Sequence, residues 1–167
     1  MTVAAQDRRY FKTLTEQEEE AILARCSRVE IAKNDVLFRK GEQSTSMYIV
    51  AEGEFVVTDE RPSQKVYLSS IRAGGLIGEM SFLDESPRSA TVTARESGVV
   101  YRLNKEDFVR TLLEAPALGS RLLLAIAILL VDRLRKADAA LTSLTVAPSR
   151  GGDDGGLAKA VESVRGS

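Results

Sequence analysis

Residues 73–92 read AGGLIGEMSFLDESPRSATV, and this stretch connects two segments that have the composition of β-strands. The connection is far longer than a hairpin needs, and long connections inside compact domains usually carry a function. It combines several glycines, a helix-forming segment at 79–83 and an arginine, Arg88, directly behind Pro87. These features predict a β domain with a short helix and an anion-binding loop inserted between two of its strands.

Segments rich in β-branched and aromatic residues recur on both sides of this connection, at a spacing of roughly eight to twelve residues. Turn signals separate them, among them Gly41, Gly53 and Pro62. The expected strands cover 36–38, 47–50, 55–58, 65–68, 89–94 and 98–103. Short strands at this spacing favour an antiparallel β-roll, or jelly-roll barrel, in an α+β domain that is mainly β.

Helices are expected on both sides of the roll. Thr15 and Glu18 form the Ser/Thr-x-x-Glu pattern of a capping box, which predicts a helix from Glu16 to about Ser27. Behind the roll, Asn104 is the expected N-cap of a further helix, and Pro116 and Gly119 interrupt the helical pattern. The predicted organisation is an N-terminal extension (1–13), the roll with its flanking helices (14–117), a long C-terminal helix (118–144) and a flexible tail (145–167).

The long C-terminal helix carries two apolar stripes. One has the alternating steps of four and three residues that are typical of a coiled-coil seam, and it consists of Leu123, Ala127, Leu130, Leu134, Ala137, Leu141 and Leu144. The other is formed by Leu122, Ile126 and Leu129 and is expected to rest on the roll. The seam predicts a homodimer through Leu123–Leu144, and packing of both stripes within one chain is the alternative.

Charge and composition exclude several classes of protein. The 167 residues include 23 Lys and Arg against 24 Asp and Glu, so no global positive field is available to attract nucleic acid. The chain has no histidine and one cysteine, Cys26, which excludes a His-based catalytic triad, a His-ligated metal site and an internal disulfide. We therefore expect neither an enzyme nor a metal cofactor.

Nothing in the sequence predicts a membrane segment. The longest apolar run, 122–131, has about half of the roughly 20 residues that span a bilayer. The first residues lack the apolar core of a signal peptide, and a single unpaired cysteine suits a reducing compartment. A cytoplasmic location is therefore expected.

The 73–92 connection contains the candidate binding residues. Gly78 lets the backbone approach a ligand closely, and the N–H groups at the start of the short helix favour an anion there. Arg88 offers a planar, permanently charged fork to a phosphate, and Ser89 adds a hydroxyl donor. The carboxylate of Glu79 only accepts hydrogen bonds, which suits a sugar hydroxyl. Phosphate and ribose together predict a nucleotide.

Each charged residue also has a simpler interpretation. Arg88 could form a surface ion pair with Asp84 or Glu85, and Glu79 could act only as a negative charge that stabilises the start of the short helix. Either interpretation would be preferred for one residue alone. The two residues together, nine positions apart around a glycine-led turn and a proline, favour the nucleotide.

Two motifs in this connection resemble a known family. The run Gly78-Glu79-x-Ser81-x-Leu83, followed by Pro87-Arg88-Ser89-Ala90-Thr91, is similar to the phosphate-binding cassette of the cyclic-nucleotide-binding domain family. The Gly41-Glu42 turn and the 53–57 segment also resemble that family, so that the similarity covers about residues 14–144. The resemblance implies that Glu79 binds the ribose 2′-hydroxyl and that Arg88 binds the cyclic phosphate.

The resemblance also implies which residues line the rest of the pocket. Phe38, Val57 and Leu68 are expected on the purine side, with Leu76 and Met80 near the sugar, although ordinary core packing would also explain these apolar residues. The full expected set is Gly78, Glu79, Met80, Ser81, Arg88, Ser89, Leu76, Leu68, Val57 and Phe38. On the C-terminal helix, Arg133, Arg135 and Lys136 are candidates for covering the base, with a solvated helix face as the alternative.

The resemblance also bears on the choice of ligand, through the residue next to Arg88. Ser89 resembles the form of the cassette in bacterial cAMP receptors, which favours cAMP over cGMP and leaves a cyclic dinucleotide open. The residues after Leu144 are too few and too acidic for a winged helix-turn-helix, so no direct binding to DNA is expected. The resulting hypothesis is a stand-alone receptor that signals through its C-terminal helices to an unidentified partner protein. The alternative is a dimeric scaffold that needs no ligand.

Overall fold

The computed structural model describes residues 13–61 and 63–145, the last three by their backbone alone. The chain divides into two compact units, residues 1–131 and 132–167. Except for Thr13 and Thr145, the predicted N-terminal extension and the predicted tail lie outside the described residues.

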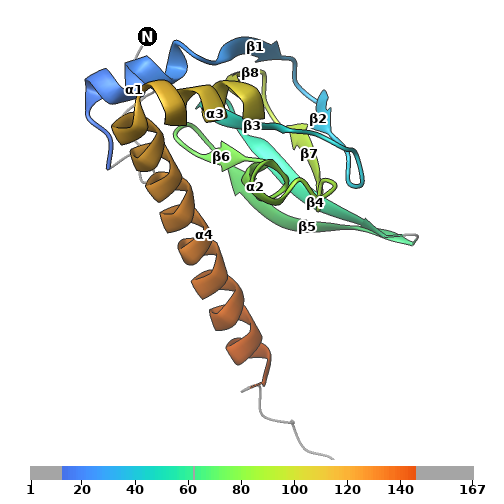
Figure 1. Ribbon diagram of the computed structural model, residues 1–167. Coiled ribbons are helices and arrows are strands. Elements are labelled where there is room, and N and C mark those ends of the chain that lie inside the picture. The colour runs from blue at the N-terminus through green and yellow to red at the C-terminus, as the bar shows by residue number, and fades with distance from the viewer. Residues whose placement is uncertain (1–12, 62, 146–167) are drawn as a thin grey trace, which may run out of the picture. The chain divides into compact units, whose positions relative to one another are not determined.

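Two four-stranded sheets form the first unit (Figure 1). The first sheet has the order β1-β8-β3-β6, with bounds Ser27–Ile31, Gly98–Asn104, Ser46–Glu52 and Leu76–Ile77. The second has the order β2-β7-β4-β5, with bounds Val36–Phe38, Thr91–Ala94, Phe55–Arg61 and Gln64–Ile71. Every strand pairing in both sheets is antiparallel. The predicted antiparallel roll is confirmed.

The described helices are α1 (Glu16–Leu23), α2 (Glu79–Asp84), α3 (Lys105–Glu114) and α4 (Pro116–Thr145). The capping box at the start of α1 is present, because the Glu18 N–H donates to Thr15 Oγ1 at 3.3 Å and the Thr15 N–H donates to Glu18 Oε2 at 2.8 Å. Asn104 is the N-cap of α3, but its side chain makes no capping hydrogen bond.

The helices differ from the sequence-based expectations at three points, while the expected interruption at Pro116 is present between α3 and α4. Helix α1 ends at Leu23, not Ser27, because residues 27–31 pair with β8 along the edge of the first sheet. Helix α4 begins at Pro116, since a proline in the first helical turn lacks only an N–H that has no partner inside the helix. Gly119 does not interrupt α4: it lies inside the helix, where a Cβ would come within 2.7 Å of Leu112 Cδ2. The glycine therefore permits a close approach between α3 and α4.

Two hydrophobic cores lie on opposite faces of the first sheet. Strand β3 contributes to both, because Ile49 packs toward the helices and Val50 packs between the sheets, as the alternation of side chains along a strand requires. The core between the sheets contains Phe38, Val50, Phe55, Ile77, Val92, Ala94 and Val100. The helix-side core contains Ile22, Leu23, Met47, Ile49, Leu76, Phe82, Leu103, Phe108, Leu118, Leu122, Ile126 and Leu129.

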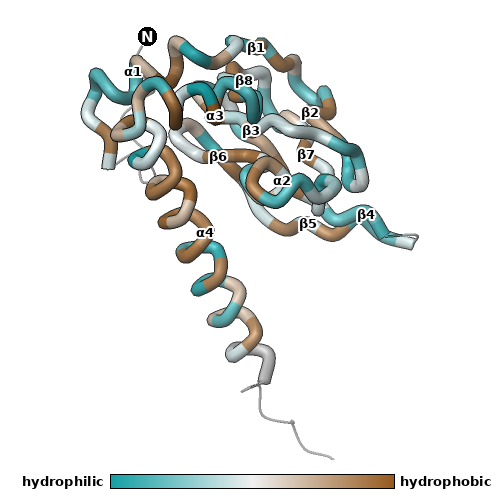
Figure 2. The backbone as a smooth tube through the Cα atoms, in the orientation of Figure 1, coloured by the Kyte–Doolittle hydropathy of each residue, from teal (hydrophilic) through white to brown (hydrophobic). Residues whose placement is uncertain are grey.

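The two apolar stripes of α4 differ in exposure. Leu122, Ile126 and Leu129 are buried in the helix-side core, so this stripe rests on the roll as expected. In the seam, Leu134 is 63% exposed and Leu141 is 65% exposed, while the side chain of Leu144 lies outside the described residues. Figure 2 shows hydrophobic positions recurring along α4. Among residues 13–61 and 63–145, no helix combines the length and hydropathy that a bilayer crossing requires.

Candidate functional site

The short helix α2 begins behind a glycine that no other residue could replace without strain. Gly78 has φ +78° and ψ 19°, a left-handed conformation that costs glycine little. A Cβ at this position would collide with Nη1 of Arg88. Gly78 thus serves both the turn into α2 and the close approach of the arginine.

Arg88 is buried, with 2% of its surface exposed, and its guanidinium is enclosed by four oxygen atoms. Nη1 donates to Gly78 O at 3.0 Å and to Ser81 Oγ at 2.6 Å. Nη2 donates to Ser44 Oγ at 2.7 Å and to Ser46 O at 2.6 Å. We call these four acceptors the Arg88 cage. They use all four hydrogens on the two terminal nitrogens, and the buried Nε has no partner among the described residues.

Aromatic rings complete the surroundings of the guanidinium. Arg88 Cζ lies 4.2 Å from the centroid of the Phe38 ring and 5.9 Å from that of Tyr48, which places the cation within cation–π range of both. Burial lowers the pKa of Arg88, while Tyr48, Glu79 and Glu42 act in the opposite direction. An arginine retains its charge in such a setting, so the site holds a permanent cation.

The simpler interpretation of Arg88 as part of a surface ion pair was wrong. The side chain is buried, and the two carboxylates proposed as its partners interact elsewhere. Asp84 Oδ1 accepts hydrogen bonds from the backbone and the hydroxyl of Ser86, and Glu85 lies 3.6 Å from Lys105 Nζ.

Glu79 is the first residue of α2 and is 1% exposed. It acts electrostatically on Arg88, as the opposing effect on the arginine pKa shows. A carboxylate that only stabilised the start of a surface helix would remain in solvent, where it would avoid the free-energy cost of burial. The structure therefore places an acidic side chain, Glu79, and a basic side chain, Arg88, together inside the protein.

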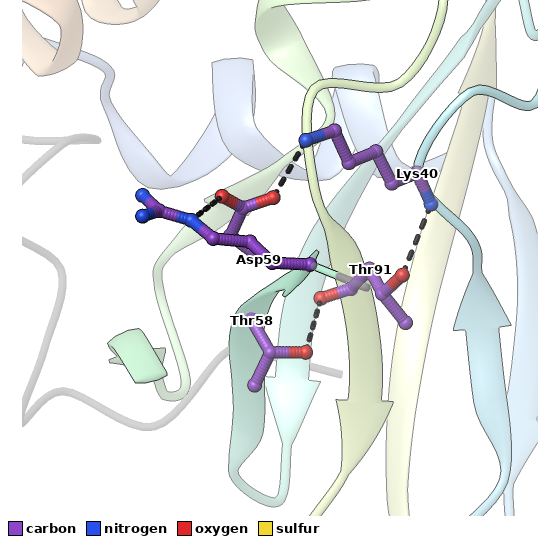
Figure 3. Close-up of polar contacts among 5 residues, drawn as sticks. Lys40, Thr58, Asp59 and Thr91 are labelled. Atoms are coloured by element: carbon purple, nitrogen blue, oxygen red, sulfur yellow. Dashed lines mark hydrogen bonds and ion pairs between the residues drawn. The ribbon is translucent and has the colours of Figure 1, made fainter. Parts of the chain in front are cut away.

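The segment that leads from β2 into the start of β3, and that supplies Ser44 and Ser46, is held against the second sheet (Figure 3). Lys40 donates from its backbone to Thr91 Oγ1 at 3.0 Å and from Nζ to Asp59 Oδ1 at 2.6 Å. Asp59 also accepts from Arg61 Nε at 3.1 Å, and the hydrogen bonds from Lys40 and Arg61 lower the pKa of the Asp59 carboxyl. Thr58 Oγ1 donates a hydrogen bond to Thr91 O at 3.5 Å, which adds Thr58 to these contacts.

Reciprocal backbone hydrogen bonds then join this loop to the arginine itself. The Gly41 N–H donates to Arg88 O at 2.8 Å, and the Arg88 N–H donates to Glu42 O at 2.9 Å. The backbone of Arg88 is thus fixed by the loop whose serines bind its side chain. The backbone and the guanidinium of Arg88 are therefore both held by residues of this one segment.

The other predicted site residues are distributed over three environments. Phe38 and Val57 belong to the core between the sheets. The ring of Phe38 also contacts the guanidinium of Arg88, so Phe38 lies in one cluster with Gly78, Ser81 and Arg88. Leu76 packs in the helix-side core instead. Met80, Leu68 and Ser89 are exposed and do not belong to the Arg88 cage.

Sequence reasoning missed three residues of this cluster: Ser44, Ser46 and Tyr48. The hydroxyl-rich run at 44–46 directly before a strand was the available signal, but serines in a turn have many other roles. Within the described residues, no group of three or more His, Cys, Asp or Glu side chains is placed to hold a metal ion.

We predict that Gly78→Ala destabilises the protein more than Gly41→Ala. Gly41 also has a positive φ, +86°, but a Cβ there would meet no atom within 4 Å. Gly41→Ala should therefore cost only the left-handed conformation, about 1–2 kcal/mol. Gly78→Ala should cost about 1–3 kcal/mol more, because displacing Arg88 leaves buried hydrogen-bonding groups unsatisfied. Urea unfolding measures both variants, and equal losses would contradict the tight fit of Arg88 against Gly78.

Comparisons with known proteins show the family to which this fold belongs. The family described as "Cyclic nucleotide-binding domain" matches residues 28–115. The chain is 30% identical over 141 residues to the cyclic AMP receptor protein of Thermus thermophilus, covering 84% of this chain and 63% of that protein. It is 30% identical over 106 residues to the cAMP-dependent protein kinase regulatory subunit of Candida albicans, covering 62% of this chain and 22% of that protein.

A solved structure extends the similarity to the whole fold. The N-terminal domain of a transcriptional regulator from Streptomyces coelicolor superposes with a TM-score of 0.66 at 30% identity, covering 87% of this chain and 99% of that one. The two relatives named above are longer, and the chain spans less than two thirds of either. With its matched family region and its two-sheet roll, the chain belongs to the cyclic nucleotide-binding domain family.

Proposed function

We propose that this protein is a receptor for a cyclic nucleotide and that its preferred ligand is cAMP. The observation that carries the proposal is the Arg88 cage. All four hydrogen bonds from the terminal nitrogens of the guanidinium go to neutral oxygens, and its Nε lacks a partner among the described residues. A buried cation is costly, and although Glu79 already acts on Arg88 electrostatically, a phosphate would add a charged acceptor for the guanidinium itself.

In this proposal Arg88 binds the cyclic phosphate, beside the turn at Gly78. Ser81 holds the guanidinium in place, and the exposed hydroxyl of Ser89 donates to the same ligand. Glu79 accepts the ribose 2′-hydroxyl, which suits a buried carboxylate on the same helix. A charge-assisted hydrogen bond inside the protein is strong, because little water competes for either partner.

The base would lie against apolar residues of the roll. Phe38 and Val57 are already part of the core between the sheets, while Leu68 and Met80 are exposed and available to a ligand. Leu76 would support the sugar from the helix-side core. Of the three basic residues considered on α4, Lys136 pairs within its own helix, with Nζ 2.7 Å from Asp132 Oδ2.

Two observations favour cAMP over cGMP. Ser89 directly follows Arg88, and this pair resembles the form of the cassette in bacterial cAMP receptors. The names of two relatives, a cyclic AMP receptor protein and a cAMP-dependent protein kinase regulatory subunit, refer to this nucleotide.

We assign the protein a regulatory rather than a catalytic role. Burial raises the pKa of Cys26 to about 12, so the thiol is not a nucleophile near neutral pH. A receptor of this kind would pass nucleotide occupancy through α3 and α4 to a partner protein in the cytoplasm.

The exposed seam of α4 supports a homodimer as part of this proposal. Leu123, Leu134 and Leu141 are exposed at the heptad spacing of a two-stranded coiled coil. Each leucine buried against a second copy would contribute up to about 1.5–3 kcal/mol.

The central prediction is that Arg88→Leu abolishes nucleotide binding. Isothermal titration of the native protein with cAMP should give a Kd of about micromolar or tighter. The variant should lose about 100-fold or more in affinity, since it loses two charge-assisted hydrogen bonds to the phosphate. Arg88→Lys keeps the charge without the planar fork and should fall between the two.

The same titration separates the other ligands and the alternative function. A cyclic dinucleotide that binds more tightly than cAMP would change the ligand assignment. A native protein that binds neither cAMP, cGMP nor a cyclic dinucleotide would refute the receptor and favour a ligand-independent scaffold. Thermal unfolding of each variant shows whether lost binding reflects lost structure.

We further predict that Glu79→Ala removes the preference for a ribose. The native protein should bind cAMP about tenfold or more tightly than its 2′-deoxy analogue, as one hydrogen bond to a charged group would provide. The variant should bind both ligands with similar affinity. Equal fold-losses for both ligands would show that Glu79 has another role.

For the dimer, we predict that the double substitution Leu134→Glu and Leu141→Glu yields a monomer that still binds cAMP. Sedimentation velocity measures the oligomeric state, and the like charges disfavour a shared seam. Ala139→Glu, at an exposed position of α4 outside the seam, is the matched control and should remain dimeric. A native protein that sediments as a monomer would exclude the proposed dimer.

A further inference from the structure

Lys105, the first residue of α3, contacts two separate segments of the chain. Its backbone N–H donates to Thr45 O at 2.8 Å. Its side-chain Nζ donates to Phe82 O at 2.7 Å and to Leu83 O at 3.1 Å. The sequence pattern alone predicts no role for this residue, because a lysine at a helix start is usually a solvated charge.

The two segments are the two walls of the Arg88 cage. One wall is the 44–46 segment, which binds Nη2 of Arg88, and Thr45 lies between its two serines. The other wall is the 78–81 segment, which binds Nη1, and Phe82 directly follows it. Lys105 therefore donates hydrogen bonds to residues that lie next to both sets of acceptors around Arg88.

The side chain of Lys105 also closes the end of α2. The last carbonyls of a helix have no partner inside it, and a cation there is favourable. The last turn of α2 contains no basic residue of its own, so α3 supplies the cation. Glu85, 3.6 Å from Nζ, and the ring of Phe82, 5.4 Å from Nζ, further fix the ammonium group.

Phosphate capture has to disturb this arrangement. All four terminal hydrogens of the guanidinium are already donated within the cage. A bidentate contact with a phosphate needs two such hydrogens, and Nε–H can supply only one of them. At least one cage acceptor must therefore be released, and the wall that carries it becomes free to shift relative to the other.

We infer that Lys105 is the positioning residue that converts phosphate capture at Arg88 into a displacement of α3. Because it is bonded to both walls, any shift between them changes its bonds and moves the first turn of the helix. The inference rests on the proposed function, since it requires an anion at Arg88. It identifies the polar connection by which the site communicates with α3.

The test uses Lys105→Met, which keeps the aliphatic stem and the backbone N–H but removes the ammonium. The fold should tolerate this change, because Phe82 and Phe108 still join α2 to α3 through an edge-to-face contact at 5.3 Å. Hydrogen exchange of the α3 amides, measured with and without saturating cAMP, reports the displacement of the helix. Isothermal titration of the same samples reports binding.

The native protein should show a cAMP-dependent change in exchange across residues 105–114, and Lys105→Met should lose it. The affinity of the variant for cAMP should stay within about fivefold of the native value or improve, because coupling to α3 no longer opposes binding. Lys105→Arg retains a cation that can reach the two carbonyls and should restore the response. Arg110→Met is the matched control, since Arg110 lies on the same helix, pairs with Asp107 at 3.4 Å and should leave the response intact.

The possible failures are distinguishable. A native protein that binds no nucleotide would overturn the proposed function, and this inference with it. A native protein that binds cAMP without any change at α3, or a Lys105→Met variant that keeps the change, would overturn the inference alone. Loss of binding in a Lys105→Met variant with a native melting temperature would also overturn it, because the residue would then belong to the binding site itself.

Discussion

Burying the guanidinium of Arg88 costs free energy, and much of the surrounding structure serves to offset that cost. Gly78 omits a side chain so that the cation can approach, and four oxygens from two distant segments accept its hydrogens. Phe38 places its ring face over the same group. The buried Nε of Arg88 has no hydrogen-bond partner among the described residues, and we propose that a bound anion completes the arrangement.

Much of this fold could be predicted because local patterns repeat. Strand patterns, turn signals and the capping box at Thr15 each act over a few residues, and the capping box and six of the eight described strands were found where they were expected. The buried apolar stripe of α4 could also be predicted, because residues three and four positions apart lie on the same face of a helix. Boundaries were less predictable where tertiary pairing competes with local preference, as at Ser27, which pairs with Arg102 rather than extending α1.

For a related reason, only part of the candidate site could be predicted from the sequence. Gly78, Glu79 and Arg88 lie within one continuous connection, so their types and spacing carried the prediction. Ser44 and Ser46 lie more than forty residues away and reach Arg88 only because the roll folds their loop back onto it. Their contacts depend on sheet topology, and no spacing in the sequence encodes that proximity.

The two stripes of α4 share a helix but have no residue in common. Substitutions at Leu122 or Ile126 would be selected against for stability, while those at Leu134 or Leu141 leave the core of the roll untouched. Leu134 and Leu141 can therefore change without loss of the roll, whereas Leu130 of the same stripe packs against the helix-side core. A duplicated copy of this chain could acquire a new binding partner by drift along one helix face, without passing through a form that no longer folds.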